Sequence, residues 1–431
     1  GQTSNGTAVI AGTIYDTGTV SSCVVKNANV EGNRYLAGIA GYLYGSVDDC
    51  AVDGITLIAT PDELAGQYDN ADKVGGIVGL SPNDNGGTIR SCKASNVTIK
   101  AFRDAGCLIG YIGDGSKVTD CKVGGTNSIT VDRTLLDDSD KVRIGEIVGC
   151  DEKSNLAQSN TKLGGSAFKF SAIVDSNNKL DTVMKNKIPI IELKALTGSS
   201  YYTIPNSGNN GNWTISSSNH AVIGVHGADV NAGEYGLQGS NVTFNNIVIQ
   251  QNPPLYLAGW SSSVLTFTNC TINGSIHLYG KTEFFDCTFN SIEDYAITTY
   301  GAANVSISNC TFNVTKDGKG AINVYSGDSD TTPHVTVDGC SFIRNSENTN
   351  SRAAVQIGPQ EYNGTDEWVI TIKNTVKCSG FLNTVYDNGL WNVKTNDASS
   401  TFTVKVSVGS SSSMATKVFN FVQGQGGTLS S

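Results

Sequence analysis

Cysteine is the residue type in this chain whose spacing most directly suggests chemistry. The chain has eleven cysteines. Several of them occupy one slot of a recurring pattern, Val-x-[Phe/Ile]-x-[Asn/Asp]-Cys-[Thr/Ser]-[Phe/Ile], which Val305–Phe312 matches in full. The members of this slot are Cys270, Cys287, Cys310 and Cys340. One interpretation is disulfide or redox chemistry. Equivalent side chains of stacked repeats point in parallel, which is unfavourable for a disulfide, so we predict a row of buried thiols instead.

The cysteine spacing also argues against metal binding. No two cysteines are closer in sequence than Cys107 and Cys121. The Cys-x-x-Cys spacing of zinc sites is therefore absent, and no metal cofactor is expected from the thiols. The odd number of cysteines leaves at least one thiol free or paired between chains.

A second group of candidate residues lies on short alternating segments that end in glycine. These segments include SIHLYG, ending at Gly280, AITTYG, ending at Gly301, and AINVYSG, ending at Gly327. If Ile276 and Leu278 point inward, alternation directs the residues between and after them outward. Rings along an elongated surface suit the flat faces of sugars, so we predict a glycan-binding row. Its members are Trp260, His277, Tyr279, Tyr300, Asn323 and Tyr325, with Thr298 beside them. The alternative is a tyrosine stack that only covers the sheet.

No catalytic residue is assigned from the sequence. The motifs HExxH and GxSxG are absent, and so is a GxGxxG that opens a helix. A glycosidase needs two carboxylates that flank the scissile bond. Glu293 and Asp294, and Asp328 and Asp330, are candidates by composition only, and we interpret them as solvated turn carboxylates. A weak calcium site at Asp328 and Asp330 is a further alternative, so calcium is the one cofactor left open.

Composition and repeats indicate how these residues are positioned. Glycine is abundant at 49 and proline is rare at 8, while Ser, Thr, Asn, Val and Ile favour strands and turns. The first half has its own repeat, seen in GTVSSCVVKNANV from Gly18 and GTIRSCKASNVTI from Gly87, with glycine-bracketed segments such as GGIVGL from Gly75 between copies. A unit of this size cannot bury its own apolar face, but stacked units can. We therefore predict an all-β fold of stacked parallel strands. The Asn or Asp before each cysteine is expected to make a turn.

Two resemblances extend this prediction. The alternation of Gly-Gly-Ile-Val-Gly and Gly-x-Val-x-x-Cys over roughly residues 10–150 resembles the GLUG repeats of bacterial surface proteins. The Asn-Cys-Thr-Phe repeats over roughly residues 190–420 resemble the right-handed parallel β-helix of the pectin-lyase-like superfamily. The resemblances imply a β-helix solenoid in two sections. The expected domains are GLUG-like repeats over 1–160, a linker and capping segment over 161–200, and a β-helix with a C-terminal cover over 201–431. The sequence NKLDTVMKNKIPIIELKA over 178–195 is the credible helix-to-strand segment within the cap.

The charge and hydropathy of the chain limit the classes of partner that we expect. The net charge is −10 with only 29 Lys and Arg, and no basic face is evident, so nucleic acid is not an expected partner. Strong binding to polyanions such as polyuronic acids is disfavoured unless a cation mediates it. No run of about 20 apolar residues exists, so no membrane span is expected.

These observations favour an extracellular or cell-surface, non-catalytic protein that resembles an adhesin. We expect its export signal to have been trimmed, and its partner to be a glycan or a host or cell-surface protein. The competing hypothesis is a polysaccharide lyase or glycoside hydrolase carried by the second section, and a purely structural stalk is a third.

Overall fold

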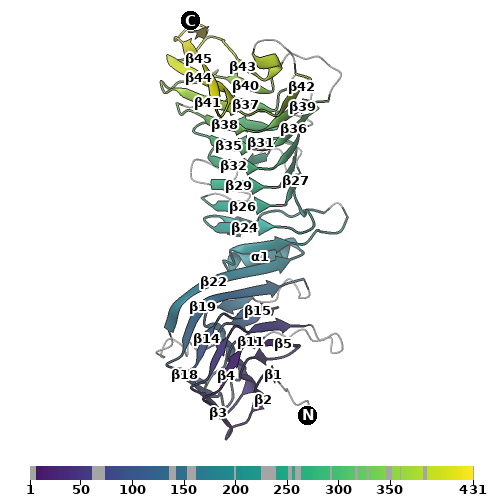
Figure 1. The fold of residues 1–431 in the computed structure, drawn as a ribbon, viewed down its shortest axis with the longest axis vertical. Coiled ribbons are helices and arrows are strands. Elements are labelled where there is room, and N and C mark those ends of the chain that lie inside the picture. The colour runs from purple at the N-terminus through teal and green to yellow at the C-terminus, as the bar shows by residue number, and fades with distance from the viewer. Residues whose placement is uncertain are drawn as a thin grey trace. The chain divides into compact units, whose positions relative to one another are not determined.

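The fold is all-β, with parallel sheets and one α-helix among the described residues (Figure 1). The computed structural model describes residues 6–60, 73–134, 142–152, 162–198, 200–224, 239–250, 255–257, 264–291, 294–315, 319–327, 330–345, 352–359, 361–381 and 386–430. The chain divides into two compact units, Gly1–Glu192 and Leu193–Ser431. The division falls within the segment 161–200 that the sequence predicted to be a linker and cap.

In the first unit, each sheet collects one strand from every repeat, and the pairings are parallel. The first sheet contains β1 (Thr7–Ala8), β6 (Leu36–Ala37), β11 (Lys73–Gly75), β16 (Asp104–Gly106) and β20 (Arg143–Gly145). The second contains β2 (Ala11–Ile14), β7 (Ala40–Leu43), β12 (Val78–Ser81), β17 (Ile109–Ile112) and β21 (Val148–Asp151). The third contains β3 (Thr19–Ser21), β8 (Ser46–Asp48), β13 (Thr88–Arg90) and β18 (Lys117–Thr119).

Two further rows of strands in this unit end on one long strand. One row is β4 (Val24–Lys26), β9 (Ala51–Asp53) and β14 (Lys93–Ser95), and the other is β5 (Asn29–Gly32), β10 (Thr56–Ala59) and β15 (Thr98–Ala101). Both continue onto β19 (Lys122–Asp132), which pairs in parallel with β22 (Lys162–Val174). Strand β22 therefore lies within the segment 161–200 that the sequence predicted to be a linker and cap, and it carries Phe168 and Phe170.

The second unit repeats the same arrangement with three parallel sheets. The longest row is β24 (Asn212–Ser216), β26 (Asn241–Asn245), β29 (Val264–Thr268), β32 (Lys281–Phe285), β35 (Asn304–Ser308), β38 (His334–Asp338), β41 (Trp368–Lys373) and β44 (Phe402–Ser410). The next is β25 (Val222–Gly224), β27 (Val248–Gln250), β30 (Thr271–Asn273), β33 (Thr288–Ser291), β36 (Thr311–Val314), β39 (Ser341–Arg344) and β42 (Lys377–Ser379). The third, called here the six-stranded sheet, is β28 (Leu255–Leu257), β31 (Ile276–Leu278), β34 (Ile297–Thr299), β37 (Ile322–Tyr325), β40 (Val355–Gly358) and β43 (Trp391–Val393).

The C-terminal segment closes the longest row with an antiparallel hairpin. Strand β45 (Ser413–Phe421) runs antiparallel to β44, and β46 (Thr428–Leu429) pairs with β45. Within this hairpin the Phe402 and Phe421 rings stack at 4.8 Å between centroids. A hairpin at this position covers an otherwise unpaired strand edge.

In-register pairing places identical side chains on top of one another in the core of the second unit. Phe267 stacks on Phe244 and on Phe284 with ring centroids 4.9 Å apart in both pairs. A second row places Phe312 4.5 Å from Phe289 and 5.1 Å from Phe342. All of these rings are buried. Each contributes on the order of 2 to 3 kcal/mol of hydrophobic stabilisation.

The helix lies where the sequence predicted a helix followed by a strand. Helix α1 (Asn177–Lys185) begins after Ser176, whose hydroxyl accepts a hydrogen bond from the Lys179 amide at 3.2 Å. It buries Leu180, Val183 and Met184 on one face, and β23 (Ile190–Leu193) follows. In the described parts of the chain, no helix has the length and apolar character needed to cross a membrane.

Each turn before a slot cysteine uses a left-handed backbone conformation. In the first unit the residues are Ser22, Asp49, Ser91 and Asp120, with φ between 49° and 57°. In the second unit they are Asn269, Asp286, Asn309 and Gly339, with φ between 52° and 63°, and Asn246 at φ 57° has the same place before Ile247. Asn and Asp tolerate this conformation best among residues other than glycine. This explains why the pattern places them before the cysteine.

This conformation predicts a reversal in the relative stabilities of alanine and glycine variants. We expect Asn309→Ala to be less stable than Asn309→Gly by about 1 to 2 kcal/mol, because a Cβ is strained at φ 56°. At Ser308, the preceding strand residue of β35, alanine should be the more stable of the two. Chemical denaturation of the four variants measures both differences, and the same sign at both positions would contradict the turn assignment.

Candidate functional site

The predicted tyrosine row is present on the six-stranded sheet of the second unit. Tyr279 and Tyr300 stack with centroids 5.0 Å apart and an interplanar angle of 15°. Tyr325 meets Tyr300 edge to face at 5.6 Å. All three side chains are half-buried. The row therefore combines ring-to-ring packing, which was the structural alternative, with partial exposure, which a binding surface requires.

His277 does not lie on an exposed surface as the sequence predicted. Its side chain is only 6% exposed, and its ring centroid lies 5.3 Å from that of Tyr300. Burial lowers the pKa of His277 to about 4, with Asp294 raising it and Lys319 lowering it further. Alternation distinguishes His277 from its neighbours Ile276 and Leu278, which point inward. It cannot predict whether neighbouring side chains then cover His277. At neutral pH this imidazole is uncharged.

Polar side chains form a second row beside the tyrosines. The register pairs His277 with Thr298 and Thr298 with Asn323, and then Asn323 with Gln356. Thr298 is buried at 3% exposure and Gln356 is completely buried, while Asn323 is half-buried. Two parallel rows, one of rings and one of hydrogen-bonding groups, thus follow the same strands.

Charged groups lie near both rows. Lys319 forms an ion pair with Asp294 at 2.8 Å, and its ammonium lies 5.3 Å from the centre of the buried Tyr295 ring. The Tyr325 hydroxyl donates a hydrogen bond to the exposed Glu361 at 2.6 Å. These contacts fix Tyr295 and Tyr325 and hold both carboxylates in specific interactions.

Sequence reasoning missed the end of this site. The segments AAVQIG and LWNVK continue the register, so Gln356, Gly358 and Lys394 extend the rows of Asn323 and Tyr325. The alternation used for Tyr325 would have found Gln356, because AAVQIG, which ends at Gly358, has the same form as the segments that carry the tyrosines. Lys394 was missed because LWNVK lacks the terminal glycine of the other members.

Some predicted residues cannot be placed. Trp260 and Asp328 lie outside the described residues. Asp330 is exposed, and no three His, Cys, Asp or Glu side chains come together as a metal site in the described part of the chain. The calcium alternative therefore stays a prediction without a geometric basis.

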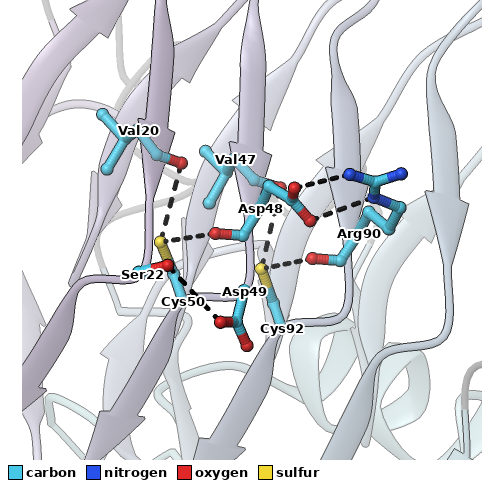
Figure 2. Close-up of polar contacts among 8 residues, drawn as sticks. All are labelled: Val20, Ser22, Val47, Asp48, Asp49, Cys50, Arg90 and Cys92. Carbon is cyan, nitrogen blue, oxygen red and sulfur yellow. Dashed lines mark hydrogen bonds and ion pairs between the residues drawn. The ribbon is translucent and has the colours of Figure 1, made fainter.

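The cysteines form the buried rows that the sequence predicted. All eleven are free thiols, and Cys23 and Cys378 are the two that are partly exposed. Figure 2 shows the arrangement in the first unit, where the Cys50 thiol donates to the Asp48 carbonyl at 3.3 Å and the Cys92 thiol to the Arg90 carbonyl at 3.2 Å. The sulfur atoms also accept hydrogen bonds, since the Cys92 amide donates to Cys121 Sγ at 3.4 Å. Each thiol thus fills a small apolar slot and links neighbouring repeats.

The same view shows an ion pair on the outside of the strands. Arg90 donates two hydrogen bonds to Asp48, at 3.0 Å from Nε and 2.6 Å from Nη2 (Figure 2). The Arg90 side chain is 59% exposed, so solvent screens the pair and its contribution to stability is small.

An aromatic cluster in the first unit was not anticipated as a site. Tyr35 meets Tyr42 edge to face at 5.2 Å, and Leu80 and Tyr111 complete the cluster with Cys150. The in-register pairing of Tyr42, Leu80, Tyr111 and Cys150 on neighbouring strands produces this row. The glycine-bracketed segments were recognised in the sequence as part of the repeat, and no site was assigned to them.

Cations surround the exposed side of this cluster. Lys73 and Arg143 lie 5.5 Å and 5.9 Å from the centre of the Tyr111 ring. Arg143 also binds the buried Asp104 through two hydrogen bonds of 2.7 Å. Burial raises the pKa of Asp104, and the Arg143 guanidinium opposes that shift. The cluster is packed as a small core of its own, with Tyr111 donating to Asn83 at 3.3 Å.

Thiol labelling tests the cysteine assignment. In the native protein we expect only Cys23 and Cys378 to react with a thiol reagent, because the other nine are buried. Cys378 should react slowly, since burial raises the pKa of its thiol to about 11. Mass spectrometry of labelled peptides identifies the sites, and rapid native labelling of Cys310 would contradict a buried row.

His277 predicts a pH dependence of stability. The unfolded chain binds this proton near pH 6.5 and the folded chain only near pH 4, so protonation favours unfolding between these values. Stability should rise from pH 4 to pH 7, with His277 accounting for about 3 kcal/mol of the rise. His277→Gln should remove that part, whereas His334→Gln, at an exposed position, should retain it. Denaturation midpoints across this range provide the measurement, and equal slopes in all three proteins would refute the assignment.

Comparisons with protein-family models, curated proteins and solved structures found no match for this chain.

Proposed function

We propose that this chain is a secreted or cell-surface, non-catalytic protein that binds a glycan through the tyrosine row of its second unit. In this proposal the parallel sheets are the faces of a right-handed β-helix, with a GLUG-like first section and a pectin-lyase-like second section. A protein ligand on the same face is the alternative for the partner. The tyrosine row is the observation that carries the proposal.

The order of the strands supports the β-helix. From β29 onward the chain visits the longest row, then the row of β30, then the six-stranded sheet, and it repeats this cycle through β37. Each strand pairs in parallel with its equivalent one cycle later, as in the pairing of β29 with β32 and β30 with β33. A chain that cycles through three sheets in this way winds around a common core.

The chemistry of the two rows supports a sugar ligand. Half-buried tyrosine rings offer flat apolar faces with hydroxyl groups at their rims. The adjacent row supplies the half-buried amide of Asn323, which suits sugar hydroxyls, whereas Gln356 is completely buried. Rings packed against each other lose little conformational entropy on binding, which favours affinity.

The carboxylates beside the rows support binding over hydrolysis. Asp294 is paired with Lys319, and Glu361 accepts a hydrogen bond from Tyr325. A glycosidase in this position would need one carboxylic acid and one carboxylate placed on either side of the bond. Release of reducing ends from a bound glycan would replace this proposal with the lyase or hydrolase alternative.

Tyr300 provides the direct test because it contacts both of its ring neighbours. We expect Tyr300→Ala to weaken glycan binding by about tenfold or more, because it interrupts the row. Tyr300→Phe, which retains the ring, should stay within about threefold of the wild type. Tyr15→Ala, at a 65% exposed tyrosine in the first unit, is the matched control.

A glycan array followed by titration of the bound glycans gives the affinities, and thermal unfolding of each variant checks folding. Unchanged affinity in folded Tyr300→Ala would remove the tyrosine row as the binding surface.

A further inference from the structure

The first repeat of the first unit, residues 6–34, has strands that are paired on one side only. Its strands β1 to β5 pair one to one with β6 to β10 of the second repeat. The other edge of each strand meets no strand in the described part of the chain. Five short strand edges are therefore open at the same repeat, and an open edge is a place where another strand can add.

Apolar side chains that are buried in the next repeats are partly exposed in the first. Ile10 is 45% exposed, whereas its counterparts Ile39 and Ile77 are completely buried. Val20 is half-buried, whereas Val47, its register partner on β8, is completely buried. The apolar core of the unit is therefore uncovered at the first repeat.

The cysteine row of the first unit is open at the same end. The thiols of Cys50, Cys92 and Cys121 each lie 3.7 to 3.9 Å from a carbonyl oxygen of the preceding repeat. Cys23 begins the row, and its thiol donates to the carbonyl of Ser21 in its own repeat at 3.5 Å. Cys23 is also partly exposed, whereas the three later thiols are buried.

Val9 adds apolar surface at this end where the repeat does not require it. The register gives Val9 the place of Gly38 and Gly76 in the next two repeats, and its side chain is 45% exposed. A terminal repeat that faces water is expected to carry a polar face. An added apolar side chain beside the exposed Ile10 favours a surface that is covered in the assembled protein.

The shape and charge of this end suit a second copy of the chain. A two-fold axis places an equal set of short edges and apolar side chains opposite the first set. The first repeat carries two acidic residues, Asp16 and Glu31, and two basic residues, Lys26 and Arg34, so its net charge is zero. The whole chain has a net charge of −10, so this end lets two copies approach with little of that repulsion.

We propose that the open end of the first repeat is the interface of a homodimer in which two copies of this chain join head to head. The strand edges of the two first repeats meet, and the apolar side chains at the two ends cover each other. A contact of this kind closes on itself, so assembly stops at two chains. The dimer carries two copies of the second unit, which raises the avidity for a surface with many ligands.

The mass of the full chain in solution tests the dimer. Light scattering coupled to size exclusion should show a mass that rises from the 45.2 kDa of one chain towards twice that value, between about 1 and about 100 μM protein. Ile10→Lys should weaken the association by about tenfold or more, because it places a charge in an apolar contact. Val376→Lys, at a 73% exposed valine of the second unit, is the matched control and should associate as the wild type does.

Thiol labelling tests the same interface in the wild type, without a substitution. Cys23 should react several-fold more slowly at the high protein concentration than at the low one, because association covers the end of the cysteine row. Cys378, the partly exposed thiol of the second unit, is the internal control and should react at the same rate at both concentrations.

The outcomes decide between a second copy and other partners for this end. A single-chain mass at every concentration would overturn the dimer and leave the end to a different partner. A wild-type mass in folded Ile10→Lys, an assembly of more than two chains, or equal Cys23 labelling at both concentrations would also overturn it. Thermal unfolding checks that the variants fold, and the labelling rates decide if Ile10→Lys does not.

Discussion

In-register parallel pairing is the constraint on which the rest of this structure depends. Because each strand pairs with the equivalent strand of the next repeat, every side chain meets its own counterpart along the sheet. The constraint is set at the corners, where residues such as Asn309 adopt a left-handed conformation and turn the chain before each buried cysteine. A shift by one residue would move a phenylalanine such as Phe312 out of the core and a polar neighbour in, so the apolar rows hold the register.

The same constraint produces both the stable interior and the candidate binding surface. Inside, it stacks Phe267 between Phe244 and Phe284, and it lets the Cys92 amide reach Cys121 Sγ. On the outer side of the six-stranded sheet it aligns tyrosines with tyrosines and amides with amides. A row of similar groups is therefore a direct result of the repeat, and row formation by itself is no sign of function. A position where the residue type changes within a row is a better guide to function, because the repeat does not explain such a change.

This distinction also explains what the sequence could predict. The thiol row, the turn before it and the stacking of Tyr279 and Tyr300 follow from alternation and repeat spacing, and the structure agrees on each. The burial of His277 could not be predicted, because it depends on neighbouring groups such as Tyr300 whose positions the repeat does not specify. The pairing of β22 with β19 could not be predicted, because the start of this segment has no alternating apolar pattern. Lys394 was missed because its segment departs from the repeat.

The end of the tyrosine row is the clearest change of this kind. Three rings are followed by a glycine, and the next outward position carries a lysine that has no carboxylate partner in the described structure. Lys394 Cδ and Nζ lie 3.6 Å and 3.7 Å from the position that a Cβ of the buried Gly358 would take, so the lysine side chain covers the place of a fourth ring. A half-buried lysine with cations as its neighbours reduces stability for the free protein. Lys394 thus takes the place of a fourth ring at the end of the row, a change that the repeat itself does not dictate.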